Sequence, residues 1–179
     1  MNARQNHLEK LRLMAVFAML GAIMFVSKLV MEFLPNVHLI GALTMIYTIV
    51  YRSKALIPLY IFVFLSGLYG GFSLWWMPYL YVWTVLWAVT MLLPKKMPTR
   101  IAIPVYMVVC ALHGLLFGVL YAPAQALLFG LNFKQTVAWV AAGFPFDVIH
   151  TIGNFVAATL VLPLSRTLLK LEGKFHQNN

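Results

Sequence analysis

The stretch LRLMAVFAMLGAIMFVSKLVMEFL, residues 11–34, is apolar apart from Ser27 and three charged side chains, Arg12, Lys28 and Glu32. About 20 apolar residues in a helix cross the ~30 Å hydrocarbon core of a bilayer. The stretch is also longer than the ~7–15 residues of a signal-peptide core, so we expect it to be retained as a first span. It therefore predicts that the chain begins with a membrane-spanning helix.

The composition of the whole chain extends this prediction. Of the 179 residues, 63% are hydrophobic and 9% are charged, whereas soluble domains carry roughly 25% charged residues. Backbone groups within lipid must pair inside their own helix, which makes helices the expected element. The sequence predicts an all-α integral membrane protein that forms a single transmembrane domain over residues 1–179.

Helix-breaking or polar residues divide the chain into six expected spans. Spans two and three are short, and the start of the last is uncertain because Pro145 lies inside its apolar run. Six spans place both termini on the same side of the membrane. The expected ranges are 11–34, 37–51, 55–69, 74–93, 101–122 and 137–169.

The cationic side chains predict which side this is. Cytoplasmic segments are enriched in Lys and Arg. With both termini cytoplasmic, only Lys28 and Lys134 fall on the outer side, out of 13 Lys and Arg. The net charge of +9 then reports orientation and contact with anionic lipid, and we do not expect nucleic-acid binding. The inner cations are Arg4, Lys10, Arg12, Arg52, Lys54, Lys95, Lys96, Arg100, Arg166, Lys170 and Lys174.

Polar side chains inside an apolar helix are costly and point to function. Asp147, His150, Thr151 and Asn154 have the spacing i, i+3, i+4 and i+7, which places them on one helix face. That face is interpreted either as part of a ligand cavity, which we favour, or as a polar seam against a neighbouring helix. A second stripe, in the fifth span, contains His113, Phe117, Tyr121 and Gln125.

The fourth span is rich in aromatic residues. Trp76, Tyr79, Trp83 and Trp87 are spaced to share one face. An interfacial belt is one interpretation, but Trp83 and Trp87 continue deeper, which favours rings lining an outward-opening pocket. An anionic ligand group could meet Lys28 or Lys134, although a surface role is the simpler interpretation of each.

Catalytic signatures are absent from the sequence. It has no HExxH, CxxC or phosphate-binding glycine motif, and its single cysteine, Cys110, lies in an apolar run. We therefore expect a non-enzyme that binds no cofactor and no metal. Two alternatives stay open: a secondary transporter with Asp147 as its proton-coupling group, and an intramembrane enzyme that uses Asp147 and His150.

Three segments carry a resemblance to a known family: NVHLIG at 36–41, WWMPYLY at 75–81 and FPFDVIH at 144–150. With the six spans, they resemble the substrate-binding S subunit of energy-coupling factor (ECF) transporters. The resemblance covers nearly the whole chain and implies capture of a vitamin or similar micronutrient at a bacterial plasma membrane. It also implies a transmembrane coupling subunit and two cytoplasmic ATPases, which use the ATP.

The resemblance also implies roles for individual residues. Ala18 and Ala22 match the Ala-x-x-x-Ala pair that packs against the coupling subunit in that family. The family's ligand contacts come from the outer loops and from spans four to six. In those regions lie the residues expected to bind substrate here, which are Trp76, Tyr79, Trp83, His113, Tyr121, Asp147, His150 and Asn154.

Overall fold

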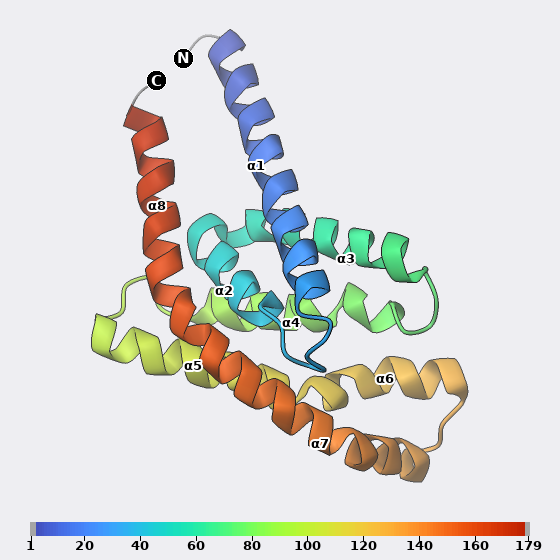
Figure 1. Cartoon of the computed structure of the whole chain (residues 1–179). Coiled ribbons are helices and arrows are strands. Elements are labelled where there is room, and N and C mark those ends of the chain that lie inside the picture. Colours follow the sequence, from blue (N-terminus) through green and yellow to red (C-terminus); the bar gives the residue numbers. More distant parts are fainter. Residues whose placement is uncertain (1–2, 178–179) are drawn as a thin grey trace.

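A computed structural model describes residues 3–177, without the side chains of residues 3, 4, 6 and 174–177, so the predicted charges of Arg4 and Lys174 lie outside the described residues. The described chain is all-helical, as predicted, and contains no strand (Figure 1). Three short 3₁₀ turns, Arg52–Ala55, Met77–Leu80 and Ala158–Leu160, interrupt it. The α-helices are α1 (Ala3–Val30), α2 (Ile40–Tyr51), α3 (Leu56–Gly70), α4 (Val82–Leu92), α5 (Thr99–Leu115), α6 (Phe117–Phe129), α7 (Phe133–Ala157) and α8 (Val161–Gln177).

Four helical stretches are long and apolar enough to cross a membrane: His7–Val30, Ile40–Gly70, Thr99–Phe129 and Phe133–Gly173. A shorter apolar stretch covers Met77–Leu92. The surface agrees with a lipid environment, because large apolar side chains such as Leu92, Leu127 and Phe133 are each more than 80% exposed. If these side chains faced water, each would lose the roughly 1.5–3 kcal/mol that burial of a large apolar side chain contributes to stability.

The second and third expected spans belong to one helical stretch that changes direction at Arg52. This residue has φ 54° and ψ −123°, a conformation that ends α2 and is uncommon outside glycine. Contacts with α4 hold it there: its guanidinium donates to the Met91 carbonyl oxygen (2.8 Å), and the Trp87 indole donates to the Arg52 carbonyl oxygen (3.1 Å). A cation near the last carbonyls of α4 is also favoured by the helix dipole.

Several expected span boundaries differ from the structure. The first helix ends at Val30 rather than 34, the second begins at Ile40 rather than 37, and the last continues past 169 to Gln177. The fourth span is not one helix over 74–93, because the 3₁₀ turn that contains Pro78 precedes α4. The fifth continues past its expected end at 122 to Phe129, with Pro123 inside α6. The sixth begins at Phe133 rather than 137, because Asn132 and Gln135 form a reciprocal capping box at the start of α7.

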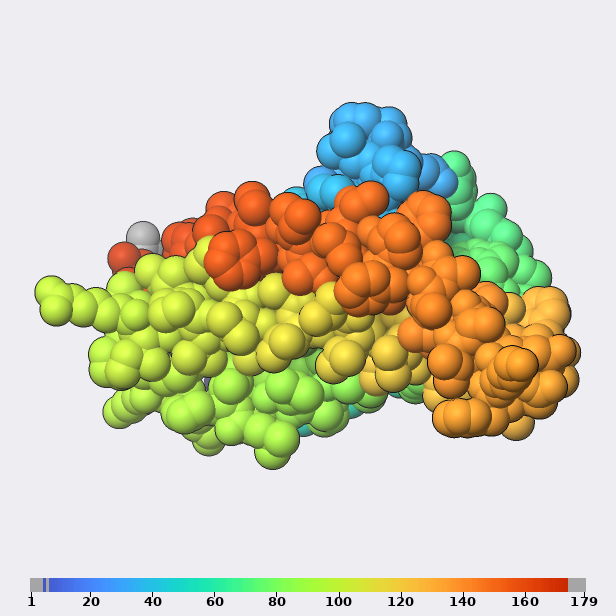
Figure 2. All heavy atoms as spheres, turned by 90° about the horizontal axis from the view of Figure 1, so that it is seen from below, coloured from blue at the N-terminus to red at the C-terminus, as the bar shows by residue number. Residues whose placement is uncertain are grey.

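Helix α2 lies at the centre of the packing. Residues 40–48 are all buried, and α2 contacts α1, α4, α5, α7 and α8. Around it, α1 packs along α3 and α5 packs along α7, and Figure 2 shows α5 and α7 side by side on one face. Gly21 permits the first of these contacts, because a Cβ there would lie 2.6 Å from Ile61 Cγ2.

The connections lie in different parts of the structure, and the 31–39 connection between α1 and α2 lies at the lower middle of Figure 1. In Figure 1 the 52–55 and 94–98 connections lie on the left, and both termini emerge at the upper left. The 71–76 and 130–132 connections lie on the right. The basic residues Arg52, Lys54, Lys95 and Lys96 therefore lie at one end, away from the two connections on the right.

Candidate functional site

A small cavity opens where the end of α1 meets the 31–39 connection. Its volume is about 170 Å³. Lys28 and Glu32 line it from the α1 side, and His38 lines it just before α2. Tyr79, Phe117 and His150 complete the wall from the 3₁₀ turn before α4, from α6 and from α7. The cavity therefore joins five segments that are far apart in the sequence.

Aromatic rings form the layer behind this wall, centred on Trp83, which is only 1% exposed. Its ring centroid lies 5.5 Å from those of His38, His113 and Phe117, and 5.9 Å from that of Tyr79. These separations are within the 4.5–7 Å range typical of interacting aromatic pairs. The aromatic residues predicted to line a pocket therefore pack on one another as a cluster of rings, with Tyr79 on the cavity wall and Trp83 behind it.

Three imidazoles meet at this cluster. The His38 and His150 ring centroids are 4.7 Å apart, and Phe117 lies 4.8 Å from His150. His113 Nε2 donates to the Val82 carbonyl oxygen at 3.1 Å. Because a carbonyl only accepts, a neutral His113 has its lone pair on Nδ1.

Several polar atoms of this cluster have no hydrogen-bond partner within the described part of the chain. They are His38 Nδ1, Trp83 Nε1, His113 Nδ1 and His150 Nε2. An unsatisfied buried polar atom costs about 1–3 kcal/mol, and the great majority of such atoms in folded proteins are paired. Two of these atoms belong to the cavity wall, on His38 and His150, and two lie directly behind it, on Trp83 and His113. Together they are the strongest feature for ligand binding in the described chain.

The polar stripe of α7 divides between two environments. His150 faces the cavity, whereas Asn154 donates from Nδ2 to the Cys110 carbonyl oxygen at 3.1 Å. Asp147 accepts from the Gly118 backbone N–H, and Thr151 bonds the Asp147 carbonyl of its own helix. The cavity and the polar seam, which the sequence presents as alternatives, are therefore both present on one helix.

Two further predicted residues are engaged away from the cavity. Trp76 donates from Nε1 to the Val63 carbonyl oxygen at 2.8 Å. Tyr121 donates to the Trp75 carbonyl oxygen, and its ring stacks on Trp139 at 6.1 Å. These bonds anchor the 71–81 connection to α3 and α6. Of the eight predicted residues, only Tyr79 and His150 line the cavity; Trp83 and His113 lie directly behind it.

Sequence reasoning missed two members of the cavity wall, His38 and Phe117, as ligand contacts. His38 belongs to the NVHLIG segment at 36–41, so its position just ahead of an apolar run was a usable signal. Lys28 was named above as a possible contact for an anionic ligand group. Its Nζ lies 6.0 Å from the ring centroids of both Trp75 and Tyr79. Lys134, the other outer cation, is an exposed residue in the first turn of α7.

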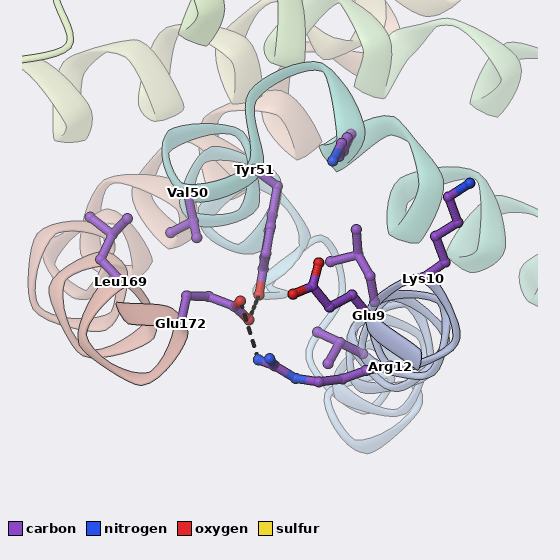
Figure 3. Close-up of a pocket in the computed structure, with 10 residues that line it drawn as sticks. Glu9, Lys10, Arg12, Val50, Tyr51, Leu169 and Glu172 are labelled. Carbon is purple, nitrogen blue, oxygen red and sulfur yellow. Dashed lines mark hydrogen bonds and ion pairs between the residues drawn. The ribbon is translucent and has the colours of Figure 1, made fainter. Parts of the chain in front are cut away.

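A larger hollow of about 510 Å³ lies between α1, α2 and α8, at the end that carries the termini (Figure 3). Arg12 forms an ion pair with Glu172 (3.5 Å), and the Tyr51 hydroxyl donates to the same carboxylate at 3.0 Å. Figure 3 shows these three side chains converging from three helices. Because Arg12, Tyr51 and Glu172 bind one another, this hollow ties the helices together and is a weaker candidate for a ligand site.

The small residues of α1 lie on different faces. Gly21 is buried against α3, whereas Ala18 is exposed and Ala22 is half-buried. An apolar hollow of about 510 Å³, lined by Ala22, Ile23 and Val26 among others, follows the same side of α1. The expected partner-binding pair is therefore accessible.

The fold and this cavity define a helical protein with four stretches able to cross a membrane and a buried cluster of aromatic and imidazole side chains. No protein-family model matches the chain, and no curated protein or solved structure gives a significant match.

Proposed function

We propose that this chain is the substrate-capture subunit of an ATP-driven ECF-type importer, and that it binds a vitamin-like solute at its outer face. The observation that carries the proposal is the 170 Å³ cavity whose wall contains His38 and His150, each with an imidazole nitrogen that has no partner among the described residues. Ligand sites characteristically combine apolar walls with a few convergent polar groups. This cavity has that composition.

The arrangement of connections supports six spans with cytoplasmic termini in a bacterial plasma membrane. The basic 52–55 and 94–98 connections share one end of the bundle (Figure 1). The cavity wall includes Tyr79, which follows the 71–76 connection at the other end. Under the positive-inside rule the first end is cytoplasmic, and the cavity then opens toward the outside.

The partners in this proposal are a transmembrane coupling subunit and two cytoplasmic ATPases. The exposed Ala18 and the half-buried Ala22 leave a shallow strip on α1 that a partner helix could approach closely. Small residues permit such backbone contact between membrane helices. The ATPases supply the energy, and this chain supplies the binding site.

The geometry does not favour the secondary transporter. That alternative requires an Asp147 carboxylate that is free to exchange a proton with the substrate pathway. Asp147 instead accepts from a backbone N–H and does not line the cavity. His150 does line the cavity, but no hydrogen bond joins it to Asp147 among the described residues, so the acid–base pair of the enzyme hypothesis is not assembled.

Reconstitution tests the proposal. The full chain is purified, small molecules that it retains are identified by mass spectrometry, and uptake of the retained solute is measured in proteoliposomes. We expect uptake only when the coupling subunit, the ATPases and ATP are all present. Uptake by this chain alone, driven by a proton gradient, would overturn the proposal in favour of the secondary transporter.

A further inference from the structure

We infer that the cavity beside His38 and His150 takes a small planar acid: a single heteroaromatic ring against Phe117 and Tyr79, with its anionic substituent at Lys28. This inference rests on the proposed function, because it names the substrate class of the same site. Size, charge and hydrogen-bonding groups each support it separately.

The volume limits the size of the ligand. Sites for drug-sized ligands measure about 300–1,000 Å³, whereas this cavity measures about 170 Å³. Trp83 blocks extension toward the core, because it lies behind the wall and is 1% exposed. One ring with a short substituent fills this space, and a larger ligand extends out through its opening.

The charges of the wall favour an anion. Lys28 and Glu32 are its two charged side chains. Lys28 is half-buried and forms no ion pair among the described residues, whereas Glu32 is exposed. Water and salt screen an exposed charge far more than a partly buried one, so Lys28 dominates the interior. Asp147, the acid that would attract a cation, is bound to Gly118 and lies outside the wall.

The remaining polar atoms favour a ring that contains a heteroatom. His38 Nδ1 and His150 Nε2 belong to the wall and have no partner in the described chain. His150 is 2% exposed, so water does not satisfy it from the surface. Because both nitrogens are buried from water, a ring nitrogen pairs with either imidazole only if that imidazole turns toward the cavity. The face of the ligand ring then packs against Phe117, whose centroid is 4.8 Å from that of His150.

Calorimetry on the purified full chain tests this inference with matched probes. The probes are the isomeric pyridine carboxylates, their carboxamides, the corresponding aminomethylpyridines and a quinoline carboxylate. We expect one pyridine carboxylate to bind at least tenfold more tightly than its amide, its amine and the two-ring acid. Equal binding of acid and amide, preference for the amine or the two-ring acid, or no binding of any probe would overturn the inference.

Two variants locate the charge effect. Lys28→Met should reduce the acid-to-amide affinity ratio to about one, whereas Glu32→Gln, one helical turn away on the same wall, should preserve or increase it. Because the ratio is measured within a single protein sample, it is independent of the folded fraction. An unchanged ratio in Lys28→Met would contradict the assignment of the anion to Lys28.

The outcomes also separate this inference from the proposed function. Tight binding of a planar acid without ATP-dependent uptake in the reconstituted importer would refute the importer and leave the substrate class standing. ATP-dependent uptake of a cationic or multi-ring solute would refute the inferred substrate class and leave the importer standing.

Discussion

Both carboxylate oxygens of Asp147 lie 3.2 Å from the backbone nitrogen of Gly118. Gly118 is the second residue of α6, where a helix N–H has no intrahelical acceptor. A negative charge near a helix N-terminus is also favoured by the helix dipole. Asp147, on α7, therefore caps α6 from a neighbouring helix and secures the helices that carry Phe117 and His150.

Asp147→Ala should reduce stability more than it reduces ligand affinity. The substitution leaves the Gly118 N–H buried without a partner, which costs about 1–3 kcal/mol. Thermal unfolding in detergent measures the change, and Thr151→Ala is the matched control, since the Thr151 hydroxyl bonds only the carbonyl of its own helix. A loss of ligand affinity with unchanged stability would instead indicate that Asp147 contacts the ligand.

Gly118→Ala should be destabilising because the space beside this glycine is already filled. A Cβ there would lie too close to the Asp147 carboxylate, and overpacking of this kind typically costs about 1–3 kcal/mol. Gly143→Ala is the control: nothing lies within 4 Å of its Cβ position, and replacing a helical glycine by alanine stabilises by roughly 0.5–1 kcal/mol. Opposite shifts in unfolding temperature are expected, and equal shifts would refute this packing.

Two tryptophans should respond differently to loss of the indole N–H. Trp83→Phe removes an indole N–H that has no partner among the described residues, so we expect little cost from hydrogen bonding. We expect a loss of ligand affinity because the smaller ring supports Tyr79 and Phe117 of the cavity wall less well. Trp76→Phe removes a 2.8 Å bond to the Val63 carbonyl and should lower stability by about 1 kcal/mol. Titration calorimetry and thermal unfolding of both variants measure the contrast. Unchanged ligand affinity in Trp83→Phe would show that Trp83 does not contribute to ligand binding.

Ala18→Leu and Ala22→Leu should weaken assembly with the coupling subunit while leaving ligand binding intact. Added side-chain volume keeps a partner helix away from this strip of α1. Ala88→Leu, at an exposed position of α4, supplies the control for added bulk. Co-purification with the coupling subunit measures assembly, and wild-type yields for all three variants would exclude this strip as the interface.

Local sequence was sufficient for the helices and insufficient for some of their ends. The capping box of Asn132 and Gln135 was readable in the sequence, and it determines the start of α7. The turn at Arg52 was not readable, because bonds to Met91 and from Trp87, both in α4, hold its unusual conformation. A local pattern contains no information on such distant partners.

The sequence by itself was sufficient to predict helices that are long and apolar enough to cross a membrane, because composition and the length of an apolar run depend only on neighbouring residues. It also placed Asp147, His150 and Asn154 on one face, because helical periodicity is local. Only the tertiary structure decided which of them faces a cavity. His150 meets His38, Asp147 meets Gly118 and Asn154 meets Cys110, and each partner is brought there by the packing of other helices.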